Sequence, residues 1–125
     1  MSEVSFADFK KCDLRVAKIL EVYEIPGADR IWKLLVDVGL EKKEIVAGVK
    51  SFYSREQLLG RSIIILNNLS PAVIRGTESR GMLLAASSKS APATGSEAMP
   101  TTGKEETRLC LLGLEHDLPP GSSVG

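Results

Sequence analysis

Residue types suited to RNA contact gather in one segment, residues 67–86, with the sequence NNLSPAVIRGTESRGMLLAA. It holds Arg75 and Arg80 among hydroxyl and amide side chains, followed by Met82. Arginine can chelate a phosphate or stack on a base, and hydroxyls and amides can bond base edges or a ribose 2′-OH. A methionine sulfur can lie against an unstacked base. The segment therefore indicates an RNA contact or, alternatively, a solvated polar loop with Met82 in the core.

Residues elsewhere in the chain offer little catalytic chemistry. The chain has one histidine, His116, in a polar turn context, and two cysteines, Cys12 and Cys110, outside any CxxC pattern. A structural zinc site would lack ligands, and the sequence holds no GxxxxGK[ST], GxGxxG or HExxH motif. We expect no enzyme activity, no metal and no cofactor. Asp29 and Arg30 are expected to form a local ion pair that orders their turn.

The composition is that of one soluble globular domain, with or without a tail. The 125 residues carry 16 basic and 16 acidic side chains, which excludes a protein that coats nucleic acid by overall charge. A local basic patch remains open, and the first three expected strands or their ends could supply it through Arg15, Lys18, Lys33 and Lys50. The N-terminus has no signal-peptide core, and no apolar run reaches the roughly 18–20 residues of a membrane span. We expect a cytoplasmic protein with reduced thiols and no membrane contact.

Apolar alternation predicts an all-β fold. The expected strands are 14–22, 32–38, 44–49, 63–66, 82–86 and 109–112. Lys18 sits on the apolar parity of the first strand, so that strand is expected to bulge. A capping box from Ser54 to Gln57 predicts a short helix between the third and fourth strands, and a weaker signal at Ser5 predicts another. Five strands with a helix in that place is the order of an OB-fold, a five-stranded Greek-key barrel, although another small barrel would share it.

The composition changes near residue 87. Residues 88–106, SKSAPATGSEAMPTTGKEE, are rich in Ser, Ala, Pro, Thr and Gly and hold one large apolar residue, Met99. Such a stretch cannot bury enough surface to offset its ordering entropy. We expect an OB-fold domain over 1–87, a flexible linker or loop over 88–106, and a C-terminal extension over 107–125.

Much of the chain resembles the tRNA-binding domain of bacterial structure-specific tRNA-binding proteins. The same domain is appended to many methionyl-tRNA synthetases and occurs in the endothelial-monocyte-activating polypeptide. The resemblance covers the region from about Phe6 to Ser87, and its landmarks occur in order: DLRVAKILEV, GADRIWKLLVDVG, Asn68-Leu69, Arg75-Gly76 and Ser79-x-x-Met82. It implies an OB-fold that binds tRNA by shape rather than by anticodon sequence.

The resemblance also suggests which residues bind. The family motif falls on Ser79 and Met82, with Asn68 before the loop, and Arg75 and Arg80 are expected to meet phosphates or bases by their chemistry. With the strand lysines, the candidate RNA-binding residues are Asn68, Arg75, Ser79, Arg80, Met82, Lys18, Lys33 and Lys50. The chain departs from the family at Val73, where many members have a basic residue, and in its longer 88–106 linker.

Three functions fit these expectations. The first is a non-catalytic tRNA-binding module, acting alone or in trans to an aminoacyl-tRNA synthetase, with the methionyl type as first choice. The second is a dimeric secretion-related chaperone of the same fold, with an apolar groove built from Phe6, Phe9 and the extension. The third is a structural docking or dimerisation piece of a synthetase. The resemblance also implies a homodimer, joined partly through the extension over 107–125.

Overall fold

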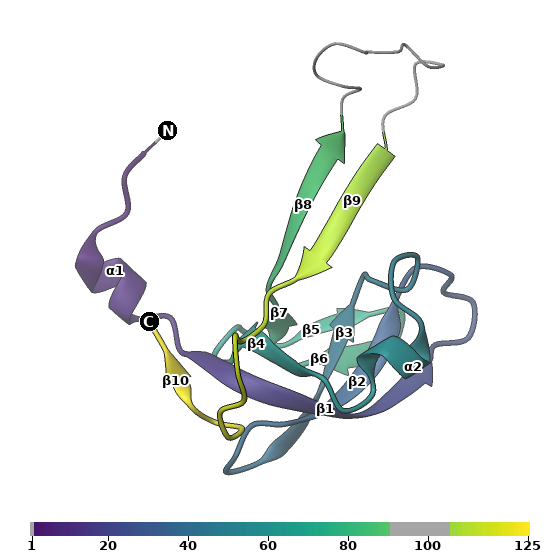
Figure 1. Cartoon of the computed structure of the whole chain (residues 1–125), viewed down its shortest axis with the longest axis horizontal. Coiled ribbons are helices and arrows are strands. Elements are labelled where there is room, and N and C mark those ends of the chain that lie inside the picture. The colour runs from purple at the N-terminus through teal and green to yellow at the C-terminus, as the bar shows by residue number, and fades with distance from the viewer. Residues whose placement is uncertain (1, 91–105) are drawn as a thin grey trace.

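The computed structural model describes residues 2–90 and 106–125, and most of its elements are antiparallel strands (Figure 1). The helices are α1 (Phe6–Lys10) and α2 (Arg55–Leu58). The strands are β1 (Leu14–Glu24), β2 (Trp32–Asp37), β3 (Lys42–Ala47), β4 (Ser62–Leu66), β5 (Ala72–Ile74), β6 (Thr77–Ser79), β7 (Met82–Leu83), β8 (Ala85–Ser90), β9 (Glu106–Leu111) and β10 (Ser123–Val124).

Strand β1 lies at the centre of the main sheet. Its C-terminal half pairs with β2 and its N-terminal half with β4, both antiparallel. A register shift between Ile19 and Glu21 confirms the expected bulge, and Lys18 is exposed. Val22, beyond the bulge, is buried as expected, and Val16 before the bulge is buried as well, but there Ala17 and Ile19 are the residues that join the main core cluster. The inward face of β1 is therefore one residue out of phase with the prediction on the N-terminal side of the bulge.

The sheet curls into the expected OB-fold barrel. Its strand order is β3-β2-β1-β4-β7, and β3 is joined on its other side by the chain just after β6. There the Arg80 N–H donates to the Glu44 carbonyl over 3.0 Å. The interior is filled by apolar side chains that are fully buried, among them Ile19, Leu34, Ile45, Leu58, Ile63 and Ile65. The third strand begins earlier than expected, at Lys42 rather than residue 44.

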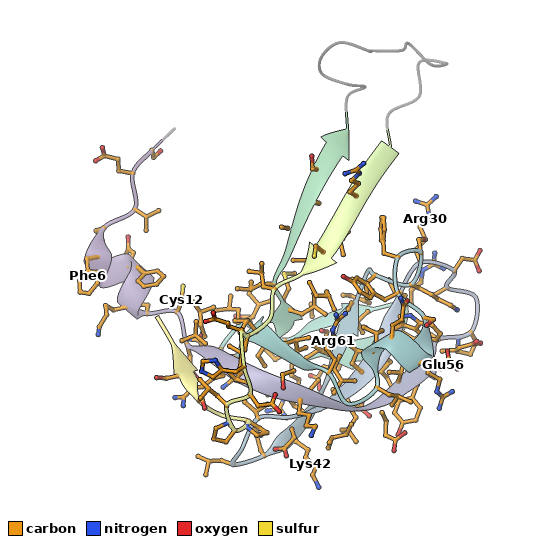
Figure 2. The ribbon with its side chains drawn as sticks, in the orientation of Figure 1. Phe6, Cys12, Arg30, Lys42, Glu56 and Arg61 are labelled. Carbon is orange, nitrogen blue, oxygen red and sulfur yellow. The ribbon has the colours of Figure 1, made fainter. Side chains whose placement is uncertain are left out.

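Both predicted helices are present, but they differ in what they bury. The capping box of α2 is confirmed, with reciprocal hydrogen bonds between Ser54 and Gln57, and Leu58 enters the core. Helix α1 is capped by the hydroxyl of Ser5, as expected, yet none of its residues is buried. Phe6 is 73% exposed and points away from the barrel (Figure 2).

A long two-stranded ribbon projects from the barrel (Figure 1). Strand β7 ends at Leu83, and the chain then continues as β8, which pairs with β9 from Ala85↔Leu111 to Ser90↔Glu106. Residues 88–90 and 106, expected in the linker, are therefore strand residues, because cross-strand hydrogen bonds satisfy their backbone without requiring apolar side chains. The rest of that predicted linker, 91–105, lies outside the described residues.

The end of the chain returns to the barrel. Strand β10 pairs with Leu14 and Arg15 of β1, on the edge that β2 leaves open. Gly121 lies against the 38–39 turn so closely that a Cβ on it would stand 2.7 Å from the Val38 carbonyl oxygen. The last residues of the extension thus belong to the main sheet.

Candidate nucleic-acid interface

The segment between β4 and β7, expected to be a loop, contains a hairpin. Strands β5 and β6 pair across a two-residue turn, Arg75 and Gly76, whose φ angles are +52° and +79°. Positive φ at both central residues is typical of a type I′ turn. The hairpin was missed because its strands have three residues each, and because the usual Asn-Gly signal is replaced by Arg-Gly.

This hairpin reaches the loop between β1 and β2. The Arg75 side chain is exposed, and its Nη1 donates to the Gly27 carbonyl oxygen over 3.4 Å. Residues 27–31 and Arg75 together line an open hollow of about 170 Å³. The loop is held in place because Ile25 and Ala28 are buried against Val46 of β3. Two segments far apart in sequence therefore meet at one rim of the barrel.

Arg30 belongs to the same rim. It is exposed and points outward from the loop (Figure 2). The expected ion pair with Asp29 is wrong, because among residues 2–90 and 106–125 Asp29 and Arg30 form no ion pair with each other. The Arg30 carbonyl accepts the backbone N–H of Lys50 over 3.2 Å, and the Lys50 ammonium lies 4.7 Å from the centroid of the Trp32 ring. Lys50 is therefore joined to the loop through its backbone, while its ammonium is held over the Trp32 ring.

Ser79 faces inward rather than toward solvent. The residue is 5% exposed, and its hydroxyl accepts the Val46 N–H over 2.9 Å and donates to the Gly81 carbonyl over 3.0 Å. Both bonds join the end of the hairpin to β3. A hydroxyl with both functions used inside the protein positions the neighbouring loop, and in this conformation it is not presented to a ligand.

Arg80, the next residue in the chain, lies near a buried lysine, Lys43. The Arg80 side chain is exposed, whereas Lys43 is 6% exposed and its Nζ donates to the Asn67 carbonyl over 3.0 Å. Burial lowers the pKa of Lys43, and the positive charge of Arg80 acts in the same direction against the opposing charge of Glu41. The sequence did not indicate a role for Lys43, because its hydrogen-bond partner is 24 residues away.

Asn68 and Asn67 fasten the start of β1. The Asn68 amide accepts the Asp13 N–H over 2.9 Å and donates to the Lys11 carbonyl over 2.7 Å. The Asp13 carboxylate accepts hydrogen bonds from Asn67 over 3.0 Å and from Arg15 over 2.6 Å. These bonds, that from Asn67 first, lower the pKa of Asp13. The Asn68 side chain is thus engaged within the protein.

The other candidates are spread over the barrel surface. Lys33 forms an ion pair with Glu44 at 3.6 Å and lies over the Tyr23 ring. Met82 is 53% exposed, so the alternative that placed it in the core is wrong. Lys18 is exposed opposite Asp37, at the far end of β2 from the loop that carries Arg30.

The structure therefore brings together some of the candidates and separates others. Arg75 meets Arg30 at the rim formed by the β1–β2 loop and the β5–β6 hairpin, which we call the loop rim, and the backbone of Lys50 bonds the Arg30 carbonyl. Arg80 and Met82 lie where the chain passes from β6 into β7: the Arg80 N–H bonds Glu44 of β3, and Met82 pairs with Leu66 of β4. Within the described part of the chain, no His, Cys, Asp and Glu residues cluster as a metal site, and no helix is long and apolar enough to span a membrane.

Comparison with known proteins agrees with this architecture. The family model described as "Putative tRNA binding domain" matches residues 14–123. The match covers the barrel, the ribbon and most of the C-terminal extension. The chain therefore belongs to the tRNA-binding domain family.

Relatives of the chain include much longer proteins. It is 41% identical over 124 residues to a methionine–tRNA ligase of Methanococcus aeolicus, covering 99% of this chain and 16% of that ligase. A methionyl-tRNA synthetase-related protein of Pyrococcus horikoshii superposes with a TM-score of 0.77 at 28% identity, over 100% of both chains. The chaperone CsaA of Bacillus anthracis superposes with a TM-score of 0.74 at 25% identity, over 99% of this chain and 100% of that one.

Proposed function

We propose that this chain is a non-catalytic module that binds tRNA by its shape, alone or in trans to an aminoacyl-tRNA synthetase. The observation that carries the proposal is the family match over residues 14–123. The exposed cations of the loop rim support it, because a protein with no net charge needs a local basic site to hold a phosphate backbone. The site offers shape and charge and no set of acid, base and nucleophile.

The proposed contacts divide by exposure. Arg75, Arg80 and Met82 are exposed and are assigned direct contact with RNA. Lysines 18, 33 and 50 are assigned weaker phosphate contacts, with Lys33 reduced by its pairing to Glu44. Ser79 and Asn68 are assigned positioning roles, since their polar atoms are already bonded within the protein.

We propose that the synthetase with which this chain acts is a methionyl-tRNA synthetase. A methionine–tRNA ligase matches nearly the whole chain at 41% identity, although the chain spans only 16% of it. Because aminoacylation of tRNA takes place in the cytoplasm, we propose a cytoplasmic location for this chain. Co-purification of this chain with a methionyl-tRNA synthetase, together with tight tRNA binding, would support action in trans. Co-purification with only weak tRNA binding would support a structural docking role instead.

We also propose a homodimer. Helix α1 presents Phe6 and Phe9, which are 73% and 42% exposed, beside β10 at the C-terminus. Apolar side chains of this size on a helix that buries nothing are typical of an interface between protein chains. Sedimentation of the wild type and of Phe6→Ser tests this: the wild type should be a dimer and the variant a monomer.

A chaperone function is the second candidate. The likeness to the CsaA chaperone and the groove of about 460 Å³ lined by Phe6, Phe9 and Val124 favour it. Suppression of the aggregation of a denatured client at a stoichiometric ratio would support it. Tight tRNA binding without any effect on clients would remove it.

Alanine variants test the proposed RNA site. Arg75→Ala and Arg80→Ala should each weaken binding of labelled tRNA, measured by fluorescence anisotropy, because each removes an exposed guanidinium. Met82→Ala should have a smaller effect that depends on the RNA. If all three variants bind like the wild type, these residues are not the site.

A further inference from the structure

Arg30 and Arg75 come from different loops and face the same hollow. Residues 27–31 and Arg75 line it, so one wall is the β1–β2 loop and the other is the tip of the β5–β6 hairpin. The 3.4 Å contact from Arg75 Nη1 to the Gly27 carbonyl is long for a hydrogen bond and uses one of five N–H donors. Arg30 has neither an ion pair nor a side-chain hydrogen bond to any residue in the described ranges.

Fold stability does not account for an arginine at position 75. Its φ of +52° is in the left-handed region, where glycine or asparagine is the favoured choice. The other central residue of the turn is Gly76, which is the residue type that a type I′ turn favours. An arginine in this strained conformation points to a role for its exposed side chain.

The surroundings of the hollow favour an anion. Lys50 is tied to the Arg30 carbonyl through its backbone N–H, and its ammonium is held over the Trp32 ring. Asp29 is the acid of the loop, and it does not neutralise Arg30 by an ion pair. The loop backbone is fixed by burial of Ile25 and Ala28, so the arginines need little ordering on binding.

We propose that Arg30 and Arg75 form a clamp for one phosphodiester of the RNA backbone, with Lys50 adding positive charge beside it. Two guanidinium groups can bond the same phosphate from both sides, and phosphate is the group that their planar donor geometry fits best. This proposal rests on the proposed tRNA-binding function and adds to it Arg30 and the identity of the bound group.

Affinity and salt dependence of tRNA binding test the clamp. Arg30→Ala and Arg75→Ala should each weaken binding about five- to twentyfold at low salt. Because both arginines bind one phosphate, the tRNA affinity of the double variant should be no more than about twofold below that of the weaker-binding single variant. The slope of log affinity against log salt should fall by about one in the double variant, as for one lost phosphate contact.

A matched control is Lys42→Ala, which removes an exposed cation at the opposite end of the barrel from Arg30 (Figure 2). It should bind tRNA nearly as the wild type does. All variants should unfold at the wild-type temperature, because both arginines are exposed. Polyglutamate at equal charge concentration should not displace tRNA from the wild type.

Several results would overturn the clamp. If Arg30→Ala binds like the wild type, or if the two losses multiply and the slope falls by about two, the arginines do not share a phosphate. Displacement by polyglutamate would assign the hollow to acidic peptides instead. If Arg80→Ala weakens tRNA binding while neither Arg30→Ala nor Arg75→Ala does, the clamp is refuted but the proposed tRNA-binding function is retained. A wild type that binds no tRNA would overturn the proposed function and the clamp with it.

Discussion

Replacing Ser79 by alanine should lower the free energy of unfolding of the barrel. The hydroxyl is buried, and it joins the Val46 N–H to the Gly81 carbonyl across the gap between β3 and the chain after β6. Alanine keeps the backbone in place but cannot bond either group. One donor and one acceptor, both within the protein, would lose their partner.

The size of the effect follows from those two groups. A buried polar group left without its partner costs about 1–3 kcal/mol, so the pair is expected to lower the free energy of unfolding by about 2–4 kcal/mol. For a chain of 125 residues, an unfolding entropy of about 2.1 cal/mol/K per residue converts each kcal/mol into about 4 °C. The melting temperature should therefore fall by about 8–15 °C.

Thermal unfolding followed by circular dichroism, together with urea titration, measures this loss. Glu78→Ala is the matched control, because Glu78 is the preceding residue of β6 and is exposed. It should change the free energy of unfolding by less than about 0.5 kcal/mol. tRNA affinity of Ser79→Ala is then measured well below its melting temperature.

A Ser79→Ala variant that melts like the wild type would refute the stabilising role of the two internal hydrogen bonds. Lost tRNA binding in such a stable variant would mean that the hydroxyl contacts RNA directly, which its two internal hydrogen bonds argue against. Retained binding in a destabilised variant would agree with a positioning role.

Three further predictions concern the barrel and its C-terminal strand. Gly121→Ala should destabilise by about 2 kcal/mol or more and lower the urea midpoint, because φ is +92° and the Cβ would meet the Val38 carbonyl. The lowered pKa of Asp13 implies stability that is present above its ordinary value of 3.8 and lost as pH falls through the lower folded value, so Asp13→Asn should show a shallower loss of stability in acid urea titrations. In Asn68→Ala the Asp13 amide should exchange its hydrogen faster, as it loses its acceptor at 2.9 Å; an unchanged rate would refute the fastening role.

Local features of this fold could be read from the sequence. The capping box at Ser54 and Gln57 needs residues three apart, and it is present with both hydrogen bonds. The buried alternation of Trp32, Leu34 and Val36 follows from the pleat of a strand with one face in the core. Lys18 revealed the bulge because a charged residue does not occupy the inward face without a partner.

The site depends on contacts that no local pattern contains. The bond from Val46 to Ser79 spans 33 residues, and the contact from Arg75 to Gly27 spans 48. Only the three-dimensional arrangement of the strands and loops shows that Ser79 lies inside and that Arg30 and Arg75 line one hollow. The sequence could therefore predict candidate residues for RNA contact by their chemistry, but not which of them are exposed and which are engaged within the protein.

Recognition of whole tRNA by shape is the central claim, and one binding measurement tests it most directly. Anisotropy of labelled tRNA is compared with that of a single-stranded RNA and a duplex RNA of equal length, at two salt concentrations. We predict that tRNA binds more tightly than both, with a salt slope of a few phosphate contacts. Equal binding to all three RNAs, or binding to none, would contradict the claim.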